Sequence, residues 1–219
     1  MKRVMGYKMT HDSGFAPNPF YGHLTLATCK PGIRRTREQG DWVAGFASKE
    51  LVRNAKAQGV DMPYMGLVYL MQVTEAPQPL EDYFEDPRFT KKKPDSGSRS
   101  PQRRSGDNIY AGDGKGGYRW QDNAHHDEDY LAHDTGGRNA LISSRFWYFG
   151  RKAFVPQEGW SVFLRERMSE GRAFYCPDSF LTRIQAYFAE LGIHPGVQAD
   201  PCMWPPKIIG TPTGSRCAA

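Results

Sequence analysis

Two apolar runs constrain the fold of this chain most, because both have the length and composition of buried strands. Residues 66–76, GLVYLMQVTEA, are rich in the β-branched and aromatic side chains that strands favour. Residues 41–48, DWVAGFAS, alternate Trp42, Ala44 and Phe46 with Val43 and Gly45, which is the period of a strand. Both runs therefore predict strands.

Shorter segments extend this sheet-forming pattern. Residues 4–10 and 24–28 are predicted as strands on either side of a proline-rich loop, APNPF, and residues 139–150, NALISSRFWYFG, return to a strand pattern. The 23 glycines and 16 prolines indicate many turns and argue against an all-helical chain.

Two segments predict helices. Pro31 stands where a helix begins and Gly40 where it ends. Residues 178–192 form the clearest amphipathic helix, which Asp178 or Ser179 would cap and Gly192 would terminate. Its apolar stripe, interpreted as core, comprises Phe180, Leu181, Ile184, Tyr187, Phe188 and Leu191.

Together these elements favour an α+β fold. Short strands with short helices, and no long alternation of strands and helices, indicate a compact α+β or small-barrel architecture. A doubly wound sheet, and with it a nucleotide-cofactor dehydrogenase, is disfavoured.

The positive charge of the chain is concentrated in one segment. The net charge is +5, and residues 91–104 alone account for it. This segment has six basic residues against Asp95: Lys91, Lys92, Lys93, Arg99, Arg103 and Arg104. Residues 90–118 are poor in apolar side chains and are predicted to form a surface loop. Lysines and arginines combined with aromatic residues are the composition that nucleic-acid binding requires, although a basic run is also common in solvated loops.

The cysteines and the N-terminus indicate a cytoplasmic protein. The four cysteines are far apart and form no CxxC pair, so they are interpreted as reduced thiols. No apolar run follows the basic N-terminus, and no window approaches a membrane span, so no membrane association is expected. Cys29, next to Lys30, is either a reactive thiol of lowered pKa or a buried structural residue.

Histidines and carboxylates are concentrated in residues 125–134, HHDEDYLAHD. These are metal-ligand residue types, but their spacing matches no zinc signature, and no metal is assigned. The same side chains can hydrogen-bond to a base or act as general acids and bases near neutral pH. The candidate catalytic residues are His125, His126, Asp134 and Cys29.

Several segments together resemble a known family. They are HDSGFAPNPFYGHLTLATCKPGIRRTREQGDWVAGF, LVYLMQVTEA, EDPRF, GDNIY and LISSRFWYFG, spanning about residues 3–160. They are similar to the second class of the nucleotide modification associated domain family of bacteria and phages. For that family, genomic neighbourhood points to making or handling modified bases in DNA, so the resemblance implies a pathway more firmly than a reaction.

A second similarity concerns the fold. GDWVAGF followed by LVYLMQVTEAPQP is similar to the arrangement in PUA-like barrels such as the ASCH, EVE and YTH domains, which bind nucleic acids. The resemblances imply a PUA-like domain over residues 1–160, with the basic surface loop at 90–118. Residues 161–219 are expected to form a helical extension and a proline-rich tail.

Three functions remain open at this point. The first is binding of a nucleotide or modified base. The second is an enzyme that modifies a nucleotide or base. In that enzyme the histidine and aspartate cluster would act as acid and base or as metal ligands, and Cys29 would be the nucleophile. The third is a protein-interaction subunit, with residues 91–104 contacting an acidic partner. The cofactor is unknown. The expected nucleotide-binding residues are Phe15, Asn18, Lys30, Arg34, Arg35, Trp42, Asp107, Asn108 and Tyr110.

Overall fold

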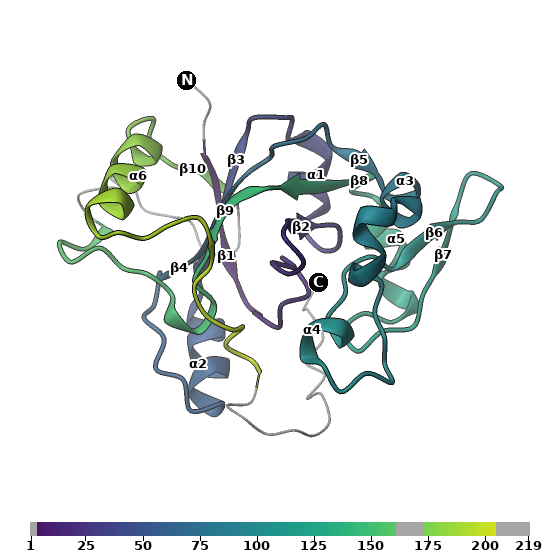
Figure 1. Ribbon diagram of the computed structural model, residues 1–219, viewed down its shortest axis with the longest axis horizontal. Coiled ribbons are helices and arrows are strands. Elements are labelled where there is room, and N and C mark those ends of the chain that lie inside the picture. The colour runs from purple at the N-terminus through teal and green to yellow at the C-terminus, as the bar shows by residue number, and fades with distance from the viewer. Residues whose placement is uncertain (1–3, 161–172, 205–219) are drawn as a thin grey trace.

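The computed structural model describes residues 4–160 and 173–204. Its centre is an open six-stranded sheet in the order β10-β1-β3-β4-β9-β11 (Figure 1). The strands are β1 (Val4–Met9), β3 (Trp42–Ala47), β4 (Leu67–Gln72), β9 (Arg145–Tyr148), β10 (Phe174–Tyr175) and β11 (Gly196–Val197). The strands predicted at 4–10, 41–48 and 66–76 are therefore confirmed.

Pairing in the central sheet is mixed. β1 runs parallel to β3, β3 is antiparallel to β4, and β4 is antiparallel to β9. The short strands β10 and β11 lie at the two edges of the sheet, which does not close on itself. The α+β class is confirmed, whereas a small PUA-like barrel is not.

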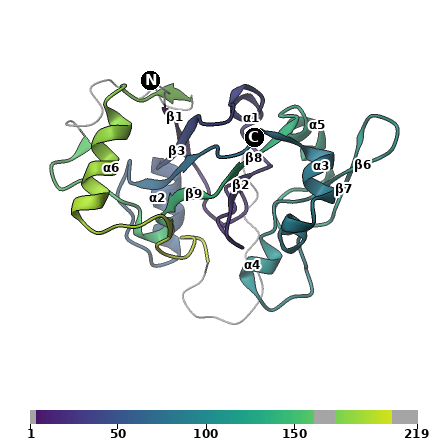
Figure 2. The ribbon, with the colours of Figure 1, turned by 45° about the horizontal axis from the view of Figure 1, so that its top comes forward.

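Two smaller sheets lie beside the central one. The first has the order β2-β8-β5, from β2 (Leu24–Leu26), β8 (Asn139–Ser143) and β5 (Gln78–Pro79); the second is the hairpin of β6 (Tyr110–Gly112) and β7 (Tyr118–Trp120). The run predicted as one strand at 139–150 is thus two strands, separated at Ser144, which link two sheets (Figure 2).

Helices cover the sheets. They are α1 (Pro31–Thr36), α2 (Lys49–Ala57), α3 (Leu80–Glu85), α4 (Pro101–Arg104), α5 (Leu131–Thr135) and α6 (Phe180–Glu190), with short 3-10 helices at Pro87–Lys92, Glu128–Tyr130 and Gly150–Lys152. The helix predicted from Pro31 to Gly40 ends earlier because Arg37 has an extended backbone. Among the described residues, none of the helices has the length and apolar character needed to cross a bilayer.

The two faces of the central sheet have different partners because alternate strand residues point to opposite sides. On one face Tyr7, Met9 and Tyr69 pack with Leu51 of α2. On the other face Trp42 and Trp147 pack with buried residues of α6. Of the predicted apolar stripe, Phe180, Ile184 and Phe188 are buried in this face, Leu181 and Tyr187 are partly buried against it, and Leu191 is exposed.

A third apolar cluster lies under the smaller sheets and combines Phe15 with Tyr83, Phe89 and Tyr110. It includes part of the segment 90–118 that was predicted as a surface loop. In that segment Ser105, Asp107, Asn108 and Ile109 are buried, and Lys92 is completely buried. Lys92 therefore adds no positive charge to the surface.

The C-terminal part of the chain packs against the central sheet. β10 pairs with β1, β11 pairs with β9, and α6 covers one face between them. The backbone N–H of Cys202 donates to the buried carboxylate of Asp12. Most of the predicted proline-rich tail lies outside the described residues.

Candidate active site

The site is built around Cys29, in the turn between β2 and α1. Cys29 and Lys30 have φ angles of 54° and 43°. Consecutive non-glycine residues in this left-handed region are costly and are found mainly where function requires them. Two hydrogen bonds hold the turn: the backbone N–H of Cys29 donates to Asp134 Oδ1 at 2.7 Å, and Arg34 Nε donates to the carbonyl of Cys29 at 2.7 Å.

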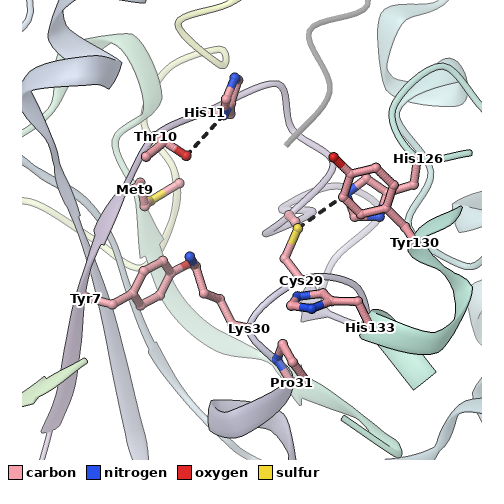
Figure 3. A pocket seen from close by; sticks show the side chains of 11 residues that line it. Tyr7, Met9, Thr10, His11, Cys29, Lys30, Pro31, His126, Tyr130 and His133 are labelled. Atoms are coloured by element: carbon pink, nitrogen blue, oxygen red, sulfur yellow. Dashed lines mark hydrogen bonds between the residues drawn. The ribbon is translucent and has the colours of Figure 1, made fainter. Parts of the chain in front are cut away.

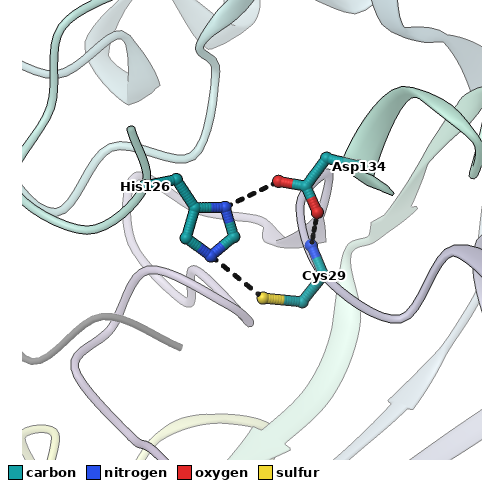
Figure 4. Close-up of side chains that lie close together, drawn as sticks. All are labelled: Cys29, His126 and Asp134. Atoms are coloured by element: carbon teal, nitrogen blue, oxygen red, sulfur yellow. Dashed lines mark hydrogen bonds and ion pairs between the residues drawn. The ribbon is translucent and has the colours of Figure 1, made fainter. Parts of the chain in front are cut away.

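His126 lies between the thiol and a carboxylate. Its Nε2 is 3.5 Å from Cys29 Sγ, and its Nδ1 is 2.7 Å from Asp134 Oδ2 (Figure 4). Asn123 fixes the preceding turn, because its Oδ1 accepts from the backbone N–H groups of His125 and His126. The order thiol, imidazole, carboxylate is that of a cysteine nucleophile with a general base and a group that orients the base.

Asp134 is completely buried in α5 and is surrounded by donors. The hydroxyl of Tyr110 donates to its Oδ2 at 2.7 Å. The guanidinium of Arg34, also completely buried, lies 4.0 Å from Oδ1 and donates to the backbone carbonyls of Cys29, Asn139 and Asp134. A Cβ on Gly137 would lie only 2.4 Å from Arg34 Cζ, so this glycine leaves room for the arginine.

The electrostatics of the site favour a charged histidine. Burial lowers the pKa of His126, but the hydrogen bond and charge of Asp134 and the contact with Cys29 together outweigh burial and raise this pKa to about 9. Burial raises the pKa of Asp134, and its contacts with His126, Tyr110 and Arg34 lower it overall. At neutral pH the site thus holds an imidazolium beside the sulfur, and such a cation stabilises a thiolate.

A pocket of about 130 Å³ is lined by Cys29 and His126. Figure 3 shows Cys29 and His126 on its wall, with Tyr7, Thr10 and His11 on the opposite side and Lys30 between them. The ring of Tyr130 stacks on His126, with 4.2 Å between centroids. The thiol of Cys29 is therefore accessible from the pocket, while the carboxylate of Asp134 is completely buried.

The same three side chains are also of metal-ligand types, and one ligand atom from each of Cys29, His126 and Asp134 lies within 4.8 Å of the others. The donor set fits a metal poorly. Both oxygens of Asp134 already accept hydrogen bonds, from the Cys29 N–H, the Tyr110 hydroxyl and His126 Nδ1. Because the carboxylate binds the ring nitrogen remote from the thiol, the geometry is that of a catalytic triad.

The structure brings together most of the candidate catalytic residues. Cys29, His126 and Asp134 meet in the triad, whereas the ring of His125 contacts Phe15 in a tilted arrangement, with 4.7 Å between centroids. Burial, and then the charges of His126 and His11, lower the pKa of His125 to about 4, so it is neutral at pH 7. Phe15 also contacts the ring of His126 and so supports the site from behind.

The predicted nucleotide-binding residues separate into several groups. Lys30 lines the pocket, Arg34 and Tyr110 hold Asp134, and Arg35 is exposed beside them, 3.4 Å from the Gly136 carbonyl. Trp42 packs on the opposite face of the central sheet, with its ring 6.4 Å from that of Trp147. Trp42 and Lys30 therefore lie on opposite faces of the central sheet.

Asn18, Asp107 and Asn108 belong to a separate buried network. Lys92 Nζ donates to the carbonyl and side-chain oxygens of Asn18 and to the carbonyl of His23. Asp107 accepts from Thr25 and Tyr83, and Asn108 donates to the carbonyl of Tyr83. These residues hold segments of the fold together and do not line the pocket of Cys29.

Tyr7, His11 and Tyr130 line the pocket but were not predicted. Tyr130 lies within residues 125–134, the segment rich in histidine and aspartate, so its place in that segment could have identified it as a site residue. Tyr7 and His11 come from β1 and the turn after it, and only the folded sheet brings them opposite Cys29.

Tyr110→Phe tests the support of the carboxylate. Loss of the hydroxyl leaves Asp134 Oδ2 with one donor fewer in a buried position, so we expect the free energy of unfolding to fall by about 1–2 kcal/mol. Urea unfolding of the variant and the parent measures this change. An unchanged urea midpoint would show that the hydrogen bond contributes nothing to stability.

Comparison with known proteins gives one family assignment. The model of the family described as nucleotide modification associated domain 2 matches residues 1–207, which extends beyond the segments that carried the resemblance in the sequence. Neither a curated protein nor a solved structure matches the chain. Since the match covers all but the last 12 of 219 residues, the chain belongs to the nucleotide modification associated domain 2 family.

Proposed function

We propose that this chain is a cysteine-dependent enzyme that hydrolyses or transfers an acyl group on a nucleotide or base. One observation carries the proposal: Sγ of Cys29 faces Nε2 of His126 while Nδ1 of the same ring faces Asp134. The family assignment supports a nucleotide-modification context for the substrate. In this proposal, the nucleotide or base that the sequence predicts as a ligand is the substrate of the enzyme.

The reaction has two steps. The Cys29 thiolate attacks the carbonyl carbon of an ester or amide, and the His126 imidazolium gives its proton to the departing oxygen or nitrogen, which leaves a thioester. Water or an amine acceptor then attacks the thioester carbon and gives a proton to His126, and the thiolate is released. Asp134 keeps the ring oriented throughout and stabilises its charged form.

Enzymatic action is favoured over binding alone because a base-binding wall would not need a thiol on a left-handed backbone beside an oriented imidazolium. Trp42, the tryptophan expected to contact a base, packs with α6 on the other face of the sheet. Contact of residues 91–104 with an acidic protein stays a prediction, now without the charge of Lys92.

A generic activated ester tests the proposal without knowledge of the natural substrate. With p-nitrophenyl acetate we expect a rapid release of about one p-nitrophenolate per chain, with the acetyl group found on Cys29 by peptide mass spectrometry. Cys29→Ala should abolish the burst. Cys217→Ser, which changes a cysteine outside the described residues, is the matched control and should retain it. A burst that persists in Cys29→Ala would refute the proposal.

A further inference from the structure

The pocket of Cys29 is lined by basic groups beyond the triad itself. Lys30, His11 and His133 line it together with His126, and no aspartate or glutamate is among the described residues that do so. Lys30 Nζ lies 5.2 Å from the centroid of the Tyr7 ring, at the middle of the pocket (Figure 3). The positive charge at neutral pH comes from Lys30 and the His126 imidazolium, since the pKa of His11 is lowered from its usual value of 6.5, and a neutral substrate would not need this charge.

A second pocket adjoins the first. It is lined by Lys8, Gly32, Ile33 and other residues, and it shares Tyr7 and Lys30 with the pocket of Cys29. No carboxylate lines it either among the described residues. Lys30 and Tyr7 therefore stand at the junction of two cavities, where one molecule can contact both.

The charge of Lys30 is felt within the first pocket. Burial lowers the pKa of His11, Glu50 raises it, and the charge of Lys30 lowers it. Glu50 does not line either pocket. An anion at the junction would therefore meet Lys30 and the imidazolium of His126 without a facing carboxylate.

We propose that the substrate is a phosphate-bearing nucleotide, whose phosphate binds Lys30 at the junction of the two pockets while its reactive carbonyl reaches Cys29. The placement of the carbonyl at Cys29 rests on the proposed function, whereas the binding of the phosphate to Lys30 does not. Ammonium groups are effective phosphate ligands as point charges, and a partly enclosed site strengthens the attraction. A nucleoside without phosphate would lack this contact.

Two alkylating reagents of similar size but different charge test the anion site directly. The rate constants for Cys29 with iodoacetate and iodoacetamide are measured by mass spectrometry, and their ratio is compared with that of a small free thiol. We expect the ratio to be higher for Cys29, and to fall about fivefold or more in Lys30→Gln, because the positive charge favours the anionic reagent. Lys56→Gln, an exposed lysine on α2, is the matched control and should leave the ratio unchanged.

A ratio that does not change in Lys30→Gln would overturn the proposal. Failure of Cys29 to react with iodoacetamide would contradict the cysteine chemistry, and a second measurement then still tests the anion site. In the Cys29→Ser chain, a mixture of deoxynucleoside 5′-monophosphates should raise the melting temperature, whereas the nucleosides should not. The Lys30→Gln change should remove that shift. An equal shift with inorganic phosphate alone, or with the nucleosides, would overturn the nucleotide assignment.

Discussion

His126→Asn should slow the alkylation of Cys29 by iodoacetamide at pH 6 about tenfold or more. A cysteine of ordinary pKa, about 8.5, is less than about 1% thiolate at pH 6, whereas an imidazolium within contact distance keeps most of the sulfur ionised. The lower intrinsic reactivity of a stabilised thiolate offsets part of this gain. The rate is followed by mass spectrometry of the peptide that contains Cys29.

The pH dependence of this effect has a definite sign. Because the pKa of His126 is raised to about 9 from its ordinary value of 6.5, the ring stays charged from acid pH to about pH 9 and then loses its proton. The difference between parent and variant should thus be largest near pH 6 and should vanish above pH 9. The raised pKa of His126 also stabilises the fold, because the charged ring pairs with Asp134. This contribution is fully present below about pH 6.5 and is lost as the pH rises through about 9.

His194→Asn is the matched control, since this histidine is exposed in the segment before β11. It should leave the rate at Cys29 unchanged at every pH. Equal rates for His126→Asn and the parent at pH 6 would mean that the imidazole does not act on the sulfur.

Arg34→Met should lower the free energy of unfolding by about 3–5 kcal/mol, the usual cost of removing one partner from a buried charge pair. The change removes one of the two cations beside the completely buried Asp134, the other being the His126 imidazolium, and it removes the donors of three backbone carbonyls. Methionine keeps much of the apolar stem, so the loss is mainly electrostatic. Urea unfolding measures it.

Arg35→Met provides the comparison within the same helix. Arg35 is exposed, and its guanidinium makes one long hydrogen bond, of 3.4 Å, to the Gly136 carbonyl. We expect a change within about 0.5 kcal/mol, as for most surface substitutions. Similar losses for the two arginines would contradict the view that Arg34 is held by the buried carboxylate.

Much of the central sheet could be predicted from the sequence because its strands are apolar runs. The runs at 41–48 and 66–76 became β3 and β4, two neighbouring strands of the centre. Whether the sheet is open or closes into a barrel could not be predicted, because this depends on which distant strands pair. The chain interrupts the run at 139–150 at Ser144 and so joins two sheets instead of continuing one barrel.

The members of the triad could be named as candidates, but their association could not be derived. Cys29 and His126 are 97 residues apart, and local patterns carry no information on such a contact. Alternation in 41–48 shows that Trp42 lies on one face of a strand, but not which face meets the site. Composition likewise marked Lys92 as a surface cation, although three oxygen acceptors hold it in the interior.

The central claim, that Cys29 and His126 form a thiolate and imidazolium pair at neutral pH, is tested most directly by titrating the thiolate through its ultraviolet absorbance. The difference between the parent and Cys29→Ser isolates this sulfur from the other three cysteines. We predict one thiolate per chain already at pH 6, and its absence at that pH in His126→Asn. A thiolate that appears only near pH 8.5, in the parent and the variant alike, would contradict the account.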